Sequence, residues 1–282
     1  KSKILMWGFD LYPEAIIVSK NKLLTLFSKI FKYIAKFCYK YLDVIVDIGP
    51  CMRNLYRKYN HNAKEETLPP WSFVEPNEIL KSHTKTRFEL FKNANLTLLY
   101  TGTIGNAHDF DLFLQLARKL NSKNASLGFC FAGFGNRFDD LKSQINESDT
   151  NISIAGFVET DKELEHRLSS ADVMLISLKN RWTGISVPSK YFSALSMGKA
   201  VLFSGSKESA LSIWTNKYNL GFQLQKDNLE KVADILCDIA NNSKLISEIK
   251  KNSFETYQSY FSKKVICDKW SNLLKKTINN QD

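Results

Sequence analysis

A proline, a serine and a lysine, Pro188, Ser189 and Lys190, stand where the sequence predicts the start of a helix. The preceding run 172–177 (DVMLIS) is apolar and β-branched, as in a buried strand. Pro188 suits the first turn of a helix, and Ser189 can cap free backbone N–H groups. Because a helix N-terminus beyond a parallel strand carries partial positive charge, and Lys190 adds a full charge, the segment is suited to binding a phosphate. The alternative is a connecting loop with a solvated lysine.

Glycine turns follow three other predicted strands. Glycine lets a ligand approach the backbone closely, and four loops at one sheet edge indicate a nucleotide or a phosphorylated ligand. The turns consist of Gly102, Thr103, Ile104, Gly105 and Asn106 after the first strand, Gly133, Phe134 and Gly135 after the second, and Gly156, Phe157 and Val158 after the third.

The elements that must hold these turns alternate between strands and helices. Strands are predicted at 96–100, 127–132, 152–155, 173–177 and 200–203. Between them, apolar residues recur at helical spacing, and Thr160 with Glu163 forms a plausible capping box. The helical positions are Phe110, Phe113, Leu114, Ala117 and Leu120, then Leu141 and Ile145, then Leu164 and Leu168. Alternating strands and helices predict an α/β fold with a parallel sheet.

The order of these motifs resembles a known family. The segments YTGTIG, FCFAGFGN, ISIAGFV, ADVMLISL, VPSKYFSALSMGKAV and NLGFQL resemble the donor-binding, C-terminal half of a family 4 glycosyltransferase of the GT-B fold, in a PSK-motif subgroup. WGFDLYPEAI, LDVIVDIGPCMRNL and LPPWSFVE resemble the end of its N-terminal domain and its linker. The resemblance covers nearly the whole chain and implies a GT-B-type, Rossmann-like parallel sheet flanked by helices.

The resemblance also implies a domain organisation. Residues 1–75 would form a partial N-terminal, acceptor-side domain with the linker, and residues 76–260 a complete nucleotide-sugar-binding domain. Residues 261–282 would form a C-terminal helix that packs back toward the N-terminal part. Since the first βα units of the family precede the segment that opens this chain, a fragment, the larger piece of a split enzyme or a truncated product is expected.

The activity implied by the resemblance is sugar transfer from a nucleoside diphosphate sugar to a hydroxyl of a glycan or lipid-linked acceptor in surface polysaccharide synthesis, with retention of configuration. Lys190 would be catalytic, by stabilising the leaving diphosphate. No cofactor is expected, because the nucleotide sugar is a substrate. The residues implied to bind it are Gly102, Thr103, Gly105, Asn106, Gly133, Gly135, Gly156, Phe157, Val158, Pro188, Ser189, Lys190 and Ser193. Gly156, Phe157 and Val158 would line the base, as the matching turn does in the family. The choice of base, sugar and acceptor is expected to depend on the loop 178–187 and on the missing part of the N-terminal domain.

Two departures from the family pattern leave alternatives open. The usual pair of glutamates falls on Ile185 and Ser193, although Ser193 could still bond a ribose hydroxyl. The usual arginine and lysine after the first glycine turn are missing, with Thr103 and His108 nearby, so Lys190 would be the main cation. A catalytically silent donor-binding or partner subunit is the first alternative, and a nucleotide-sugar epimerase is the second.

Metal and redox chemistry are not expected. Asp109 and Asp111 spell an Asp-x-Asp pattern, but both are predicted in the first turn of a helix, where negative charge is favourable without an ion. The four histidines have no ligand spacing. The five cysteines, Cys38, Cys51, Cys130, Cys237 and Cys267, are widely spaced and read as reduced core residues of a cytosolic protein.

The net charge of +10 indicates an anionic partner. On one predicted helix, lysines fall on one side and apolar residues on the other, as in a helix lying on anionic lipid; the alternative is a helix packed on the N-terminal domain. The lysines are Lys29, Lys32, Lys36 and Lys40, and the apolar residues are Leu23, Phe27, Ile30, Ile34, Phe37 and Tyr41. With no transmembrane run and no nucleic-acid motif, the expectation is a cytoplasmic protein, peripheral at the inner face of the cell membrane.

Overall fold

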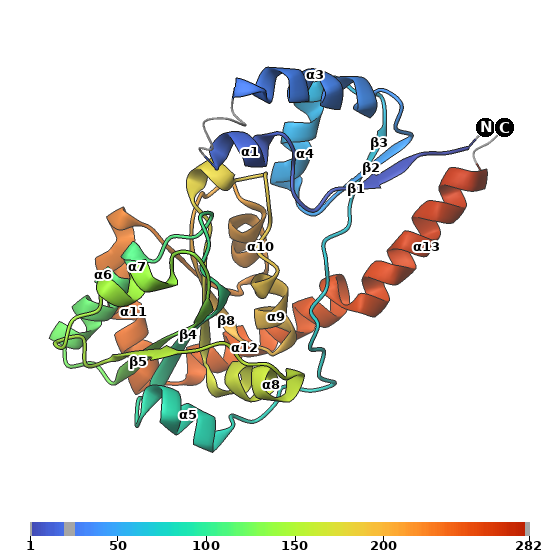
Figure 1. The fold of residues 1–282 in the computed structure, drawn as a ribbon. Coiled ribbons are helices and arrows are strands. Elements are labelled where there is room, and N and C mark those ends of the chain that lie inside the picture. Colours follow the sequence, from blue (N-terminus) through green and yellow to red (C-terminus); the bar gives the residue numbers. More distant parts are fainter. Residues whose placement is uncertain (1, 20–25, 280–282) are drawn as a thin grey trace.

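The computed structural model describes residues 2–19 and 26–279 and contains two parallel sheets (Figure 1). The small sheet has the strand order β1-β2-β3, and the large sheet has the order β6-β5-β4-β7-β8-β9. Every strand pair is parallel, which confirms the predicted α/β class. The strands are β1 (Leu5–Trp7), β2 (Val44–Asp47), β3 (Lys64–Thr67), β4 (Leu96–Thr103), β5 (Leu127–Phe134), β6 (Ile152–Ala155), β7 (Val173–Ser177), β8 (Ala200–Ser204) and β9 (Gly221–Leu224).

Helices connect the strands and cover both faces of the large sheet (Figure 1). The predicted capping box is present, because Thr160 Oγ1 accepts from Glu163 N at 3.2 Å and the Glu163 carboxylate accepts from Thr160 N. The helices are α1 (Glu14–Val18), α3 (Ser28–Tyr39), α4 (Pro50–Tyr56), α5 (Thr84–Phe91), α6 (Asp111–Ser122), α7 (Phe138–Ser143), α8 (Asp161–Ser170), α9 (Lys190–Ser196), α10 (Ala210–Tyr218), α11 (Leu229–Asn241), α12 (Lys244–Thr256) and α13 (Lys263–Asn279). Short helical turns are η1 (Arg57–Tyr59), η2 (Asn180–Trp182), η3 (Lys226–Asn228) and η4 (Tyr257–Phe261).

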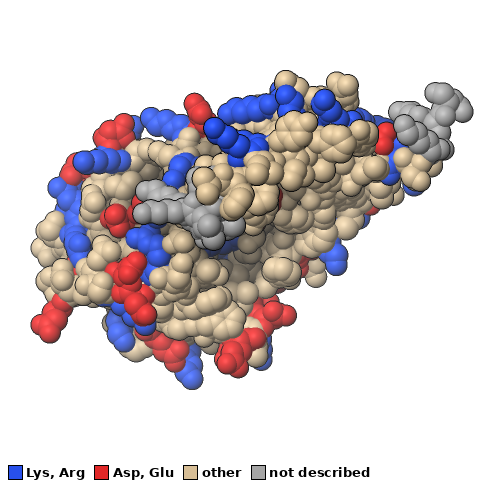
Figure 2. Space-filling view, turned by 45° about the horizontal axis from the view of Figure 1, so that its top comes forward, with Lys and Arg blue, Asp and Glu red and all other residues tan. Residues whose placement is uncertain are grey.

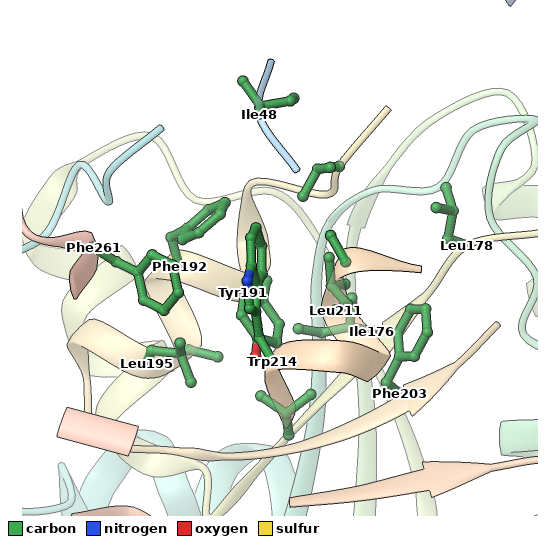
Figure 3. Packing of buried hydrophobic residues seen from close by; sticks show 14 of the residues in the cluster. Ile48, Ile176, Leu178, Tyr191, Phe192, Leu195, Phe203, Leu211, Trp214 and Phe261 are labelled. Carbon is green, nitrogen blue, oxygen red and sulfur yellow. The ribbon is translucent and has the colours of Figure 1, made fainter. Parts of the chain in front are cut away.

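The core of the large sheet has two sides, because neighbouring residues of a strand point to opposite faces. In β4, Leu98 and Tyr100 belong to the cluster on one face, and Leu99 belongs to the cluster on the other. The cluster that contains Leu99 also contains Tyr191 and Phe192 of α9. Figure 3 shows Phe192 beside Phe261, with Tyr191 and Trp214 next to them. The apolar side of α9 is therefore fixed in the core, and its first residues stay at the sheet edge.

The loops at the carboxyl ends of the two sheets touch directly. Leu11 N donates to the Ile185 carbonyl oxygen at 2.8 Å, and Ala210 N donates to Cys51 Sγ at 3.3 Å. A Cβ on Gly184 would lie 2.5 Å from the Cys51 carbonyl oxygen, so the two backbones pack too closely for a side chain there. The segment before Pro188 is consequently held from both sides.

Helix α13 crosses from the large sheet to the small one (Figure 1). Its residues Ile266 and Leu273 are buried in a cluster with Val44 and Val46 of β2 and with Leu68. Trp270 of α13 also contacts Trp7 of β1, with 5.0 Å between the ring centroids. The C-terminal helix thus packs on the small sheet and contributes to its core.

Helix α3 contacts the rest of the molecule through Ala35 and Tyr39, since Tyr39 packs on Tyr56 and Tyr59. Helix α3 thus packs on the N-terminal part with its lysines in solvent, but the expected apolar side is exposed at the described positions. Its exposed fractions are Phe27 43%, Ile30 57%, Ile34 50%, Phe37 55% and Tyr41 61%. Tyr41 follows the end of α3, and Leu23 lies outside the described residues.

Two smaller expectations are corrected. Asp109 lies before α6 rather than in its first turn, because its Oδ1 accepts from Asp111 N at 3.1 Å and ends the preceding loop. Cys38 and Cys267 are exposed rather than in the core, because they lie on the outer sides of α3 and α13. Across residues 2–19 and 26–279, no helix is both long and apolar enough to span a bilayer.

Candidate functional site

A cavity of about 420 Å³ lies at the carboxyl ends of β4, β5 and β6, beside the start of α9. Parallel strands end at the same edge of their sheet, which brings residues that are distant in sequence to one place. The expected site residues that line it are Gly102, Thr103, Gly133, Phe157, Val158, Pro188, Ser189, Lys190 and Ser193. Four expected residues, Gly105, Asn106, Gly135 and Gly156, do not line this cavity.

Lys190 reaches from α9 across to the turn after β4. Its Nζ lies 3.8 Å from the centroid of the Tyr100 ring and donates to the Thr103 carbonyl oxygen at 3.5 Å. It is also 3.8 Å from where a Cβ on Gly102 would lie. Desolvation by these neighbours lowers the pKa of Lys190 from 10.5 to about 7. The Lys190 ammonium therefore lies at the first glycine turn, where the arginine and lysine of the family pattern are missing.

The start of α9 differs from the expectation for Ser189. The backbone of Ser189 is already helical, and its side chain makes no capping hydrogen bond. Instead, the carbonyl oxygens of Pro188 and Ser189 accept from Tyr191 N at 3.1 Å and from Phe192 N at 3.0 Å. The N–H groups of Tyr191 and Phe192 are therefore not free for a ligand, and the Lys190 side chain supplies the full positive charge at this end of the cavity.

His108 lies in the same cavity wall and is neutral. Its Nδ1 is 2.8 Å from the Ser177 carbonyl oxygen, and because a carbonyl can only accept, Nδ1 carries the proton. Burial, reinforced by the charge of Lys190, lowers the pKa of His108 to about 4. The Nε2 atom is therefore an acceptor, suited to a hydroxyl of a ligand rather than to a phosphate oxygen.

The glycines at the strand ends have different reasons to be glycine. Gly133 has φ +142°, and a Cβ there would lie 2.1 Å from the Gly102 carbonyl oxygen. A Cβ on Gly135 would lie 2.4 Å from the Ile104 carbonyl oxygen. Both residues thus permit close approach between the turns after β4 and β5. At Gly156, no atom lies within 4 Å of the Cβ position, so nothing in the described part of the chain requires glycine there.

Ser193 connects the cavity with the segment between the two sheets. Ser72 Oγ donates to Ser193 Oγ at 3.2 Å, and Ser72 N donates to the Tyr257 hydroxyl at 2.9 Å. The Tyr257 hydroxyl in turn donates to the Glu75 carboxylate. Ser193 can still accept from a ligand hydroxyl, because its oxygen has two lone pairs.

Several residues of the cavity are not evident from the sequence. They come mainly from α8 and the residues before it, and from the strands below the turns. They are Thr101, Glu159, Thr160, Asp161, Leu164, Arg167, Leu168 and Met174, with His108 noted only as a neighbour. A signal existed for Arg167, which lies between the helical positions of Leu164 and Leu168 and so interrupts an apolar side with a charge.

Metal ligands are not grouped in the described residues, where no set of three or more His, Cys, Asp or Glu side chains could hold an ion. The site is therefore characterised by cations and backbone turns, with Glu159 and Asp161 at its rim.

Comparison with known proteins agrees with this arrangement. Residues 95–242, more than half of the chain, match the family described as glycosyl transferases group 1. The chain belongs to the glycosyl transferases group 1 family. The matched region of this group 1 glycosyltransferase contains all six strands of the large sheet and all the cavity residues. No curated protein matches the chain by sequence.

Solved structures show the same fold at low identity. HepE of Anabaena in complex with UDP has a TM-score of 0.73 and 11% identity, over 98% of this chain and 72% of that chain. Sucrose-phosphate synthase from Thermosynechococcus elongatus has a TM-score of 0.71 and 12% identity, over 98% and 68%. TarM of S. aureus, in a complex that includes UDP, has a TM-score of 0.65 and 14% identity, over 87% and 46%. The fold of the group 1 chain is therefore of the GT-B type, and the chain spans about half the length of TarM.

Proposed function

We propose that this chain binds a nucleoside diphosphate sugar in the cavity and transfers the sugar to a hydroxyl of a glycan or lipid-linked acceptor. The observation that carries the proposal is the position of the Lys190 ammonium, at the turn after β4 and within the cavity. Membership of a glycosyltransferase family supports the same function. The role in surface polysaccharide synthesis, the retention of configuration and the assignment to family 4 and its PSK-motif subgroup rest on the sequence resemblance.

In this mechanism, Lys190 stabilises the diphosphate as it leaves. Negative charge develops on the leaving group, and a cation in a poorly hydrated site stabilises that charge more than water would. Binding of the diphosphate returns the lysine to its charged form. His108 Nε2, an acceptor, receives a hydrogen bond from a hydroxyl of the donor sugar. We propose that no metal ion or cofactor takes part, with Lys190 supplying the positive charge.

A second candidate function is a silent subunit that binds the donor and depends on another chain for transfer. The absence of glutamates at Ile185 and Ser193 favours it, since these positions then supply no carboxylate to the cavity. The two candidates share the donor site and differ in whether sugar is transferred by this chain alone.

We further propose that the protein is cytoplasmic and lies at the inner face of the cell membrane through α3. Exposed lysines on this helix adjoin an exposed apolar side, which supports contact with anionic lipid. Figure 2 shows Lys and Arg side chains along the upper rim of the molecule and a broad area of other residues beneath them.

Thermal unfolding with UDP, GDP, ADP or CDP tests the donor site, with magnesium or EDTA present. A ligand at a hundred times its dissociation constant stabilises the folded state by about 2.7 kcal/mol, so the expected rise in Tm is easily measured. The rise should be the same in EDTA and should be lost in Lys190→Ala. The control is Lys207→Ala, which removes an exposed lysine in the loop after β8.

The outcomes separate the candidates. Stabilisation that Lys190→Ala abolishes and Lys207→Ala preserves supports the donor site, and release of the diphosphate with an acceptor then distinguishes the transferase from the silent subunit. If none of the four nucleotides raises the Tm, the donor site is wrong. A rise in Tm that requires magnesium would overturn the proposal that no metal ion takes part.

A further inference from the structure

Arg167 of α8 is a buried cation in the wall of the donor cavity. The residue is 9% exposed and lines the cavity, and its Nη1 donates to the Gly156 carbonyl oxygen at 2.7 Å. Within residues 2–19 and 26–279, no carboxylate forms an ion pair with it. Glu163 is close enough to act on its pKa, but that carboxylate bonds Thr160 in the capping box. The guanidinium thus retains N–H donors that the protein does not use.

Other arginines of the chain show that this is unusual. Five of them pair with a carboxylate: Arg53 with Asp47, Arg57 with Glu65, Arg87 with Asp172, Arg118 with Asp149 and Arg137 with Asp140. Arg181 is exposed. A buried guanidinium without a counter-ion is costly, and arginine does not escape the cost by losing its proton. An acceptor supplied by a ligand would offset this cost.

The strand order separates Arg167 from Lys190. Gly102 of β4 pairs with Gly133 of β5, and the adjacent Ala132 pairs with Ala155 of β6, so the three turns lie level at the sheet edge. The turn held by Arg167 is two strands from the turn reached by Lys190, which is about 10 Å at the usual strand spacing. One phosphate cannot contact both cations across this distance. If Lys190 holds the diphosphate, Arg167 faces the opposite end of the nucleotide.

An aromatic ring lies next to Arg167 at this end of the cavity. Phe157 is 62% exposed and lines the cavity, and its ring stands edge-to-face on Phe134, with 5.1 Å between the centroids. An exposed aromatic face suits stacking of a planar ring, and a guanidinium offers hydrogen bonds to the edge of such a ring. The two side chains together match the requirements of a nucleobase.

We propose that Arg167 selects the base of the nucleotide donor and favours a base with a carbonyl oxygen at its exposed edge, as in uracil or guanine. A guanidinium only donates hydrogen bonds, so it pairs with O4 of uracil or O6 of guanine and opposes the amino group that cytosine or adenine carries at the same position. The inference rests on the proposed donor site and assigns its base specificity to α8 rather than to the loop 178–187.

Calorimetric dissociation constants of the full chain for UDP, GDP, ADP and CDP test this inference. UDP or GDP should bind at least about tenfold more tightly than CDP and ADP, because hydrogen bonds to a charged donor contribute this much. Arg167→Gln should bring the four constants close together, since an amide both donates and accepts. Arg167→Lys keeps a side chain that only donates and should preserve the order, with weaker binding.

The comparison separates this inference from the donor site itself. If the nucleotides bind without a preference for UDP and GDP over CDP and ADP, or if Arg167→Gln keeps the preference, Arg167 does not select the base and the donor site stands. If no nucleotide binds, both are overturned. If Arg167→Gln does not fold, the other two proteins still test the inference. Tightest binding of ADP or CDP by the wild-type protein would overturn it. Equal dissociation constants for the four nucleotides in Arg167→Lys would overturn it as well. The UDP and GDP constants identify which of uracil and guanine is preferred.

Discussion

At the scale of single residues, Lys190 is charged or neutral depending on what surrounds it. In the free protein its ammonium lies over the Tyr100 ring, and desolvation holds its pKa at about 7. An anionic ligand raises this pKa, because it favours the charged form. Binding of a diphosphate is therefore coupled to uptake of a proton above neutral pH.

The affinity for a nucleoside diphosphate should consequently fall as the pH rises from 7 to 9. Below pH 7 the lysine is charged with and without ligand, so affinity is at its maximum. Above pH 7 the free protein loses the proton that the complex keeps, and the association constant falls by up to about tenfold per pH unit. Calorimetry at several pH values measures this slope.

Lys190→Arg is the matched variant for this prediction. The guanidinium stays charged throughout this range, so the slope should disappear while binding persists. Titration of the nucleotide phosphates is the same for both proteins and cancels in the comparison. An equal slope in Lys190→Arg would show that another group takes up the proton.

At the scale of elements, α3 presents both a basic and an apolar side to solvent. It is anchored by Ala35 and Tyr39, which leaves four lysines and the residues around Ile34 and Phe37 exposed. Lysines near an anionic bilayer each contribute about 1 kcal/mol to binding, and buried apolar area adds to this.

Sedimentation with lipid vesicles tests α3 as a membrane-binding element. The chain should bind phosphatidylcholine vesicles only when they contain phosphatidylserine, and replacement of Lys29, Lys32, Lys36 and Lys40 by glutamine should reduce binding at least about a hundredfold. The control replaces four exposed lysines elsewhere, Lys207, Lys226, Lys231 and Lys244. Equal loss in both variants would mean that total charge, and not α3, determines binding.

At the scale of the whole molecule, α13 packs on the small sheet by its buried residues, while Tyr257 and Phe261 of the preceding turn η4 lie in the core of the large sheet. The small sheet has three short strands, and a substantial part of its core comes from Ile266, Leu273 and Trp270 of α13. Isolated sheets of this size are marginal in water without packing partners. The small sheet is therefore expected to open first when α13 is loosened.

Ile266→Ala should destabilise the protein by about 3 kcal/mol, since it removes a fully buried side chain. Hydrogen exchange should rise first in β1, β2 and β3 and much less in β4 and β5. Leu236→Ala, which removes a fully buried residue of the large-sheet cluster, is the control and should raise exchange in the large sheet instead. Uniform exchange in both variants would contradict independent opening of the two sheets.

The sequence could predict the fold class and the sheet edge that holds the site, because strand runs and glycine turns are local signals. It could not predict that Ser189 fails to cap α9, since this depends on the helical conformation of Ser189 itself. It also could not predict which residues of α3 pack on the rest of the molecule. Tyr39 is buried because it contacts Tyr56 and Tyr59, which are distant from it in the sequence. The sequence shows Arg167 only as a charge that interrupts the apolar side of a helix, because its lack of a carboxylate partner is visible only in three dimensions.

The contact between the turns after β4 and β5 has a consequence for redesign. Gly133 and Gly135 let these two backbones meet without any side chain between them, at distances that no other residue would allow. A turn grafted from a relative would fit only together with its neighbour, because each defines the space left for the other. The two turns therefore depend on each other in shape, and a chimeric protein should receive both turns from the same parent.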